Sequence, residues 1–245
     1  MKRTLPLVAF TAVTTSLVVG CGTSHQPLAG LIASAQASEA GLDADAPLTA
    51  PDIHYMLAHG YKFCLRYVSW QSVEKRGDLT HDEAARILKA GLALMPVQHA
   101  LASSSTGQFH PTGALGTKLG RNAVKHVKNI GFPKRVTIWL DLEGVAASVP
   151  VNSIVNFCNH WYDAVSAGGF TPGLYVGYDS GLNKSQLSQL KFHYFWKSGS
   201  SVAAPFKTSY QLMQNTVGSI PGGPQFDEDH TTLNAKLLWL ERYKD

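Results

Sequence analysis

A helical segment that ends in glycine and passes at once into an apolar strand recurs four times along this chain. The glycines at these junctions are Gly60, Gly91, Gly131 and Gly168. Glycine placed after the last helical turn adopts the left-handed conformation that ends helices, so each position marks a change from helix to strand. Because regular alternation of strands and helices is typical of parallel sheets, we expect parallel strands.

The alternation also predicts the fold class. Helices are expected to begin after Thr49 and after Thr80, which has the spacing of a capping box with Glu83. Eight strands after residue 40 predict an α/β fold, a compact TIM-like (β/α)8 barrel with reduced helices in its last third. A doubly wound sheet is the alternative, but no Gly-x-Gly-x-x-Gly follows the first strand to favour it. The strands are expected at Gly41–Ala44, Phe63–Ser69, Ala93–Gln98, Val136–Leu142, Gly173–Tyr178, His193–Trp196, Tyr210–Gln214 and Gln225–Asp227.

Two carboxylates, Asp141 and Glu143, end the most apolar of these strands. Residues two apart in a strand point to the same face, and the carboxyl ends of parallel strands are where ligands bind in such folds. Two carboxylates that face one cavity repel each other, so one of them keeps its proton near neutral pH. An acid beside a base is what hydrolysis of a glycosidic bond requires. The alternative is that Asp141 caps the next turn and Glu143 is merely solvated.

Acidic and aromatic side chains also gather at the ends of other predicted strands. The tyrosines are candidates for stacking on sugar rings, with packing in the core as the alternative. Arg66 is either a charge partner of the carboxylates or a stabiliser of its strand end. His99 either lines the mouth of the barrel or belongs to a plain loop. The acidic and aromatic candidates are Asp43, Asp227, Asp229, Tyr67, Tyr175 and Tyr178.

The N-terminus has the pattern of an export signal. Lys2 and Arg3 precede an uncharged apolar segment, and the small residues before Cys21 resemble the lipobox of a bacterial lipoprotein. Residues 1–20 are therefore expected to be a signal peptide, and Cys21 a lipid-modified N-terminus. Residues 21–40 are expected to form a flexible tether, and 41–245 a single domain. Secretory cleavage after Ala35 or Ala37 is the alternative.

Composition argues against several other classes of function. Beyond Lys2 and Arg3 the chain has 19 basic and 17 acidic residues, and the cations are scattered, which gives little support to nucleic-acid binding. The histidines and the two remaining cysteines, Cys64 and Cys158, lack metal-ligand spacing. We expect no metal, no cofactor, two buried free thiols, and contact with a membrane only through the N-terminal lipid.

The order of short motifs along the chain resembles the family 25 glycoside hydrolases, the barrel lysozymes that cleave bacterial peptidoglycan. It resembles more closely a related glycoside-hydrolase-like family known as domain of unknown function 1906. The likeness spans residues 41–234. The motifs are Gly41-Leu-Asp43, Leu65-Arg66-Tyr67, Thr80 with Glu83 and Gly91, Asp141-Leu-Glu143, Gly173-Leu-Tyr-Val-Gly, Tyr210-Gln211 and Phe226-Asp227.

The resemblance implies roles for individual residues. Glu143 lies where the lysozyme family has its catalytic acid, Asp141 matches the companion carboxylate, and Asp43 matches the aspartate of the first strand. Asp227 matches a late aspartate near the sugar, a place that Asp229 is also able to take. Together, the strand-end pattern and the resemblance give the residues that we expect to bind substrate. They are Asp227, Arg66, Tyr67, Tyr175, Tyr178 and Gln211.

The resulting hypothesis is a glycoside hydrolase that acts on a cell-wall or extracellular polysaccharide such as peptidoglycan. Glu143 would protonate the leaving oxygen. Two other hypotheses stay open. One is a glycan-binding envelope lipoprotein without turnover, and the other is an inert structural protein of the envelope.

Overall fold

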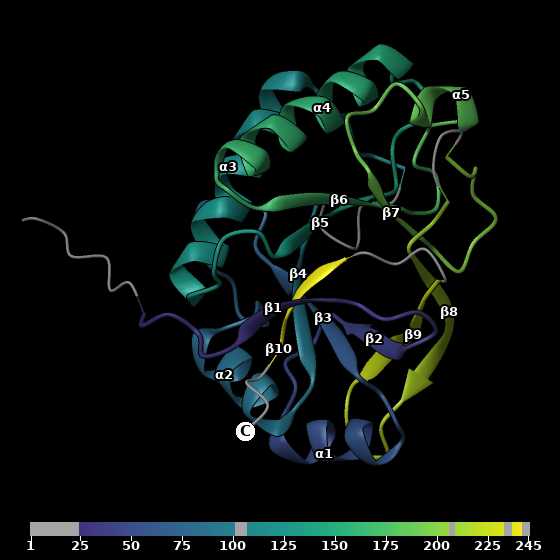
Figure 1. Ribbon diagram of the computed structural model, residues 1–245. Coiled ribbons are helices and arrows are strands. Elements are labelled where there is room, and N and C mark those ends of the chain that lie inside the picture. The colour runs from purple at the N-terminus through teal and green to yellow at the C-terminus, as the bar shows by residue number, and fades with distance from the viewer. Residues whose placement is uncertain (1–24, 101–106, 206–208, 233–236, 242–245) are drawn as a thin grey trace, which may run out of the picture.

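In the computed structural model, the described residues are 25–100, 107–205, 209–232 and 237–241. Strands and helices alternate along most of this chain (Figure 1). The elements are β1 (Leu31–Ser34), β2 (Ala40–Ala44), α1 (Ala50–Ala58), β3 (Phe63–Val68), α2 (His81–Ala90), β4 (Ala93–His99), α3 (Gly113–Ile130), β5 (Thr137–Leu142), α4 (Val151–Ala167), β6 (Thr171–Val176), α5 (Lys184–Leu187), β7 (Tyr194–Lys197), β8 (Leu212–Ser219), β9 (Gln225–Thr231) and β10 (Leu238–Glu241).

Strands β2 to β9 close into a barrel. Their order is β4-β3-β2-β9-β8-β7-β6-β5, and pairing of β5 with β4 completes the ring. All eight predicted strands form at the expected places, which confirms the TIM-like barrel. The expectation that all strands are parallel was wrong for β9, which runs antiparallel to both β2 and β8. A short turn joins β8 to β9, whereas parallel neighbours need a crossover of about a dozen residues or more.

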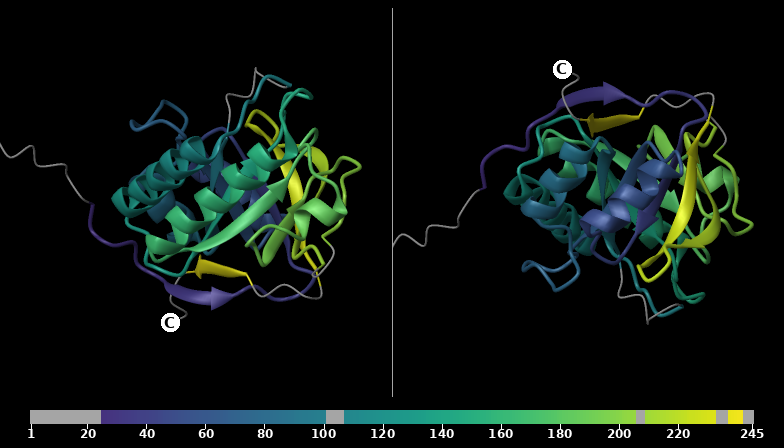
Figure 2. Two further views of the ribbon diagram at one scale, coloured as in Figure 1. Left: turned by 90° about the horizontal axis from the view of Figure 1, so that it is seen from above. Right: turned by 90° about the horizontal axis from the view of Figure 1, so that it is seen from below.

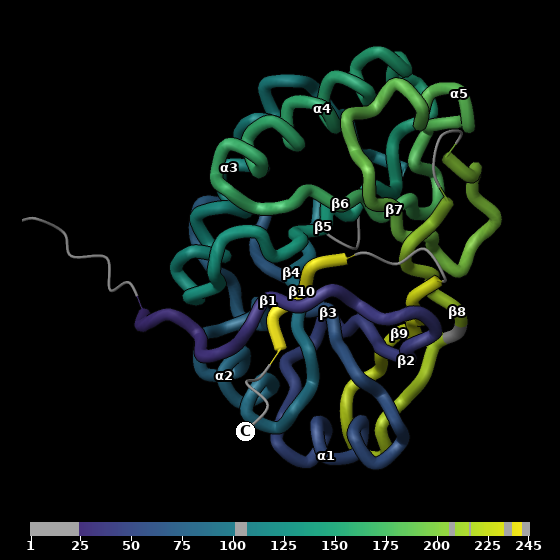
Figure 3. The backbone as a smooth tube through the Cα atoms, viewed as in Figure 1, coloured from purple at the N-terminus to yellow at the C-terminus, as the bar shows by residue number. Residues whose placement is uncertain are grey.

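Helices cover only part of the barrel. Helices α1 to α4 follow strands β2 to β5 and wrap around part of the barrel, from α1 at the bottom of Figure 1 to α4 at the top, and the backbone trace in Figure 3 shows the same arrangement. After α4, the described chain forms only the short helix α5. The reduction of helices in the last third is therefore confirmed. None of the helices in the described ranges is long and apolar enough to cross a lipid bilayer.

A two-stranded ribbon lies across the amino-terminal end of the barrel. Strand β1 pairs antiparallel with β10, and β10 contacts β4 at Leu240 and Leu94 (Figure 2). The prediction of a flexible tether over 21–40 was therefore wrong for 31–34. Pairing with β10, about 200 residues later in the chain, satisfies the backbone hydrogen bonds of this four-residue strand, and the local sequence does not reveal that partner. The predicted signal peptide and Cys21 lie outside the described residues.

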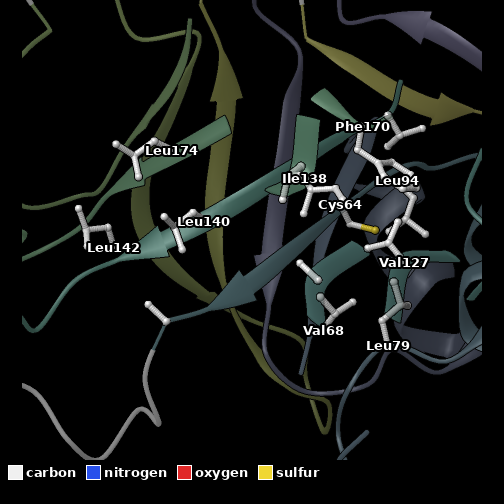
Figure 4. Packing of buried hydrophobic residues seen from close by; sticks show 14 of the residues in the cluster. Cys64, Val68, Leu79, Leu94, Val127, Ile138, Leu140, Leu142, Phe170 and Leu174 are labelled. Carbon is white, nitrogen blue, oxygen red and sulfur yellow. The ribbon is translucent and has the colours of Figure 1, made fainter. Parts of the chain in front are cut away.

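The barrel has separate outer and inner cores. The outer core packs the strands against the helices, and Figure 4 shows part of it around Cys64. Both cysteines belong to this core and are buried free thiols, as expected. The inner core fills the barrel and includes Trp139, Trp196 and Trp239. Gly173 makes this packing possible, because a Cβ atom there would lie 2.4 Å from the Trp139 ring. The filled interior leaves the carboxyl ends of the strands as the place for a ligand.

Candidate active site

Five carboxylates gather inside the carboxyl end of the barrel. Asp43 is the second-last residue of β2. Asp141 lies in β5 and Glu143 follows two residues later, so both members of the Asp-x-Glu pair point inward. Asp227 and Asp229 come from β9, where Asp227 is paired directly with Asp43. The charges of these groups act on one another. The structure thus brings together the carboxylates that the sequence singled out.

Gln214 on β8 joins this cluster, although the sequence analysis did not select it. Its Nε2 donates to Asp43 Oδ2 at 2.9 Å and to Asp227 Oδ2 at 3.0 Å. Its Oε1 accepts from the Tyr175 hydroxyl at 2.9 Å. One amide therefore fixes two carboxylates and a tyrosine. Strand alternation was the available signal, since Leu212 two residues earlier faces the inner core.

Asp43 and Asp229 form a buried carboxyl pair. Burial raises the pKa of Asp43 to about 7, and the charge of Asp227 adds to the rise, while the Gln214 hydrogen bond opposes it. Burial also raises the pKa of Asp229 well above its usual range, and the neighbouring Asp43 raises it further. Asp229 Oδ1 accepts from Trp196 Nε1 at 2.8 Å, but Oδ2 has no partner among described donors. Burial together with the mutual repulsion of the two groups favours the protonated form of this pair.

His99 holds Asp141 from the side. Its Nδ1 lies 3.3 Å from Asp141 Oδ2, its Nε2 lies 3.0 Å from Asp45 Oδ1, and its ring stacks on Tyr67 at 3.9 Å. Burial lowers the pKa of His99, but the hydrogen bonds to the two carboxylates outweigh burial and raise it to about 9. The imidazolium therefore faces Asp141 as a cation at neutral pH. Of the two readings of His99, the structure shows the one that lines the mouth.

Glu143 stands at the rim of the cluster with its side chain exposed to solvent. Partial enclosure raises its pKa to about 8, the negative charge of Asp141 adds to the rise, and His99 opposes it. Water screens these electrostatic effects at the exposed side chain, but they still raise the pKa of Glu143. Gly177 makes room for Glu143, because a Cβ atom at 177 would lie 2.5 Å from the Glu143 Cβ. Among the described residues, Glu143 has no hydrogen-bond partner that fixes its carboxyl group.

Arg66 does not join the carboxylates. It is fully buried on the outside of the barrel, where its Nε donates to Glu83 Oε1 at 2.7 Å. It also donates to the carbonyls of Asp45 and Gly77, each at 2.9 Å, and so ties down the end of β2. Of the two alternatives for Arg66, the structure shows the strand-end stabiliser. The predicted capping box forms only in half: the Thr80 hydroxyl accepts from Glu83 N, while the Glu83 carboxylate binds Arg66.

The other predicted binding residues divide into two groups. Tyr67 and Tyr175 are buried, and their hydroxyls donate to Asp43 and Gln214, so they support the site rather than offer a ring face. Tyr178 is 57% exposed, and its carbonyl accepts from Gly144 N beside Glu143. Gln211 lies outside the cluster, where its Oε1 accepts from Phe195 N at 2.8 Å. Tyr178 is thus the predicted aromatic that is open to a ligand.

Two hollows flank the mouth. A cavity of about 840 Å³ includes Asp45 and His99 in its wall, and a cavity of about 430 Å³ includes Gly177 and Asp179. The cluster lies between them, since His99 binds Asp141 and Gly177 packs on Glu143. Within the described ranges, no three His, Cys, Asp or Glu side chains are arranged to hold a metal ion. The arrangement suits proton transfer to an extended ligand that lies across the mouth.

Comparison with known protein families identifies the domain. The family described as the Rv2525c-like, glycoside hydrolase-like domain matches residues 54–232. The chain belongs to this family. The resemblance inferred from the motifs is therefore confirmed. None of the curated protein sequences compared with the chain matches it.

Solved structures with the same barrel are similar over most of the chain. A Tat-secreted Mycobacterium tuberculosis protein, Rv2525c, in complex with HEPES, is 17% identical with a TM-score of 0.60, covering 81% of this chain and 98% of that one. An uncharacterized B. stearothermophilus protein is 21% identical with a TM-score of 0.57, covering 81% and 99%. A family 25 glycosyl hydrolase from Bacillus anthracis is 13% identical with a TM-score of 0.53, covering 86% and 94%. The shared feature is the fold.

Proposed function

We propose that this protein is a glycoside hydrolase that acts on a cell-wall or extracellular polysaccharide of the peptidoglycan type. The observation that carries the proposal is the contrast between Asp141 and Glu143. Both point into the carboxyl end of one barrel, yet Asp141 faces a histidine cation while Glu143 has a pKa raised to about 8. Two carboxyl groups with divergent environments are the requirement for acid and base roles at one bond.

In this proposal Glu143 is the general acid. Its raised pKa keeps the proton on the carboxyl group at neutral pH, and its exposed position lets it reach the oxygen of a glycosidic bond lying across the mouth. Transfer of this proton to the leaving oxygen allows the carbon–oxygen bond to break without release of an alkoxide. Gly177 supports the role because its lack of a side chain leaves space for Glu143.

Asp141 and Asp43 serve the other half of the reaction. Asp141 Oδ2 is held by His99, and Oδ1 is buried with no hydrogen-bond partner among the described residues. Oδ1 is thus available to accept a hydrogen bond from the substrate, or to face the positive charge that develops on the sugar ring. Asp43 is fixed by Tyr67 and Gln214 and helps to shape the floor of the site. Tyr178 offers an exposed ring for stacking on a sugar.

We also propose that the protein is exported and anchored to the cell envelope through lipid on Cys21. The signal-like N-terminus supports this proposal, as does the description of the similar Mycobacterium tuberculosis protein as Tat-secreted. A lipid at this position would hold the barrel near its polymeric substrate. Radiolabelled palmitate should be incorporated by cells expressing the full chain, and Cys21→Ala should abolish the incorporation.

Release of reducing ends from purified peptidoglycan tests the enzymatic proposal. The parent protein should release them, and Glu143→Gln should lower the rate by about two to four orders of magnitude, as loss of a general acid does. Glu39→Gln is the matched control, because Glu39 lies before β2 at the opposite end of the barrel and should keep the parent rate. Equal rates for the parent and Glu143→Gln would refute the assignment.

A glycan-binding protein without turnover is the second candidate. One observation favours it: among the described residues, no hydrogen bond orients the Glu143 carboxyl group. This candidate predicts that the parent and Glu143→Gln bind insoluble peptidoglycan equally in a sedimentation assay while neither releases reducing ends. Release by the parent alone would exclude it.

A further inference from the structure

The larger hollow beside the mouth has walls from four different segments. Its volume is about 840 Å³, and it opens next to the carboxylate cluster through Asp45 and His99. The turn that follows β3 forms one wall, and Pro224 with Gln225, the first residue of β9, forms another. His99 lines this cavity and also lies 3.3 Å from Asp141, so the cavity directly adjoins the carboxylate cluster and continues the site on one side.

The segment after β3 is held firmly in place. Four side chains donate hydrogen bonds to its backbone carbonyls, three of them from α3 and one from the buried arginine of β3. A solvent-exposed connection does not need so many anchors to satisfy its backbone, since water suffices. The wall is thus organised before any ligand arrives, which lowers the cost of binding. The bonds run from Asn122 to Trp70 O, His126 to Gln71 O, Lys125 to Ser72 O and Arg66 to Gly77 O, at 2.7–3.0 Å.

Two adjacent cations project from this organised wall. Lys75 and Arg76 both line the cavity, and both side chains are exposed. Neither forms an ion pair with any described residue. The ammonium group of Lys75 lies 4.8 Å from the centroid of the Trp70 ring, so the aromatic face holds it in position. The charges of Lys75 and Arg76 are therefore available to a ligand.

The acidic and titratable groups of the same cavity have other partners. Asp45 lies 3.0 Å from His99 Nε2, and His99 shares its positive charge between Asp45 and Asp141. The carboxylate of Asp78 accepts from the backbone N–H of Lys75 and closes the turn that presents the two cations. The cavity thus has a cationic wall beside an acidic mouth. The separation of positive charge on the wall from negative charge at the mouth predicts a ligand that is anionic where it meets the wall and not anionic where it lies over the carboxylates.

We propose that this cavity is a subsite for a sugar unit bearing a carboxylate, which Lys75 and Arg76 bind while a neutral sugar unit lies over the carboxylate cluster. The inference rests on the proposed function, because it takes the ligand at the mouth to be a glycan. It narrows that function to acidic glycans. The guanidinium of Arg76 matches a carboxylate with two parallel N–H donors, and the ammonium of Lys75 adds a point charge.

Calorimetric titration of the full-length Glu143→Gln variant tests the subsite without turnover. The probe is a hexasaccharide in which N-acetylglucosamine alternates with glucuronate, and its matched control is the same hexasaccharide with every carboxylate converted to a methyl ester. The free acid should bind about tenfold more tightly than the ester, and high ionic strength should reduce the difference. Inorganic phosphate is titrated separately, because a site for free anions would bind it as tightly as the hexasaccharide.

Two double variants in the same background assign the effect. The Lys75→Gln/Arg76→Gln variant should bind the free-acid and methyl-ester hexasaccharides equally. Its affinity for the ester should equal that of the Glu143→Gln protein without these two changes. Lys118→Gln/Arg121→Gln removes the same two kinds of charge from an exposed face of α3 and should keep the tenfold preference. Circular dichroism checks that all the variants are folded.

The outcomes separate this proposal from the enzymatic one. A preference for the acid that depends on Lys75 and Arg76, in a protein whose parent form releases no reducing ends, would keep the subsite and refute the hydrolase. Release of reducing ends together with equal binding of acid and ester would refute the subsite and keep the hydrolase. Phosphate binding as tight as hexasaccharide binding, or no binding of either hexasaccharide, would also overturn the subsite.

Discussion

Substitution of Asp43 by asparagine is expected to stabilise the protein at slightly alkaline pH, although it removes a residue from the proposed site. The native pKa of Asp43 is raised from 3.8 to about 7, chiefly by burial. A carboxyl group with a raised native pKa stabilises the fold fully below its unfolded pKa, and this contribution is lost as pH rises through the native pKa. This difference between the native and unfolded pKa values lowers the free energy of unfolding by at most about 4 kcal/mol as the pH rises from about 4 to about 7.

The free energy of unfolding in urea, measured from about pH 4.5 to pH 8, tests this reasoning. The parent protein should lose stability across that window. Asp43→Asn should lose less and should exceed the parent at pH 8 by about 2–4 kcal/mol, because asparagine stays neutral and still pairs with Gln214. Asp163→Asn, which alters an exposed carboxylate on α4, should follow the parent. The reasoning fails if the free energy of unfolding of the parent stays constant or rises over this pH range. It also fails if Asp43→Asn shows the same pH dependence as the parent.

Three further substitutions probe the support of the site. Gly177→Ala should lower the rate of reducing-end release roughly tenfold or more, because its Cβ would lie 2.5 Å from the Glu143 Cβ and so displaces Glu143; an unchanged rate would contradict this. Arg66→Met should lower the free energy of unfolding by about 3–5 kcal/mol, since it leaves Glu83 buried without its partner, and urea denaturation that shows no loss would contradict this. Trp239→Ala should cost about 3–5 kcal/mol in the same assay by opening a cavity in the inner core, and a loss below 1 kcal/mol would show that the ribbon does not support the barrel.

The barrel strands were predictable because each is a short apolar run with a clear boundary. The ribbon of β1 and β10 was not, because both strands are only four residues long and their partners lie about 200 positions apart in sequence. The direction of β9 was hidden for a related reason: strand periodicity is the same in both directions. Only the short connection from β8 signalled an antiparallel pair.

At the site, the carboxylates were predictable from strand ends, and alternation along each strand shows which nearby side chains face them. Alternation along β3 was sufficient to exclude Arg66, because Leu65 and Tyr67 on either side of it face the inner core. The same alternation separates Gln211 from the inward-facing Gln214. Contacts such as that of His99 with Asp141 depend on how neighbouring strands are staggered, which the sequence of one chain does not reveal.

The dependence of rate on the leaving group, compared between the parent and Glu143→Gln, tests most directly whether Glu143 is a general acid. A dinitrophenyl glycoside of an N-acetylglucosamine oligomer has a leaving group that departs without protonation, whereas the sugar oxygens of peptidoglycan need a proton. Glu143→Gln should cleave the dinitrophenyl substrate within about tenfold of the parent rate, and should cleave peptidoglycan at least about a hundredfold more slowly. Equal losses on both substrates, or no turnover of either by the parent, would contradict the account.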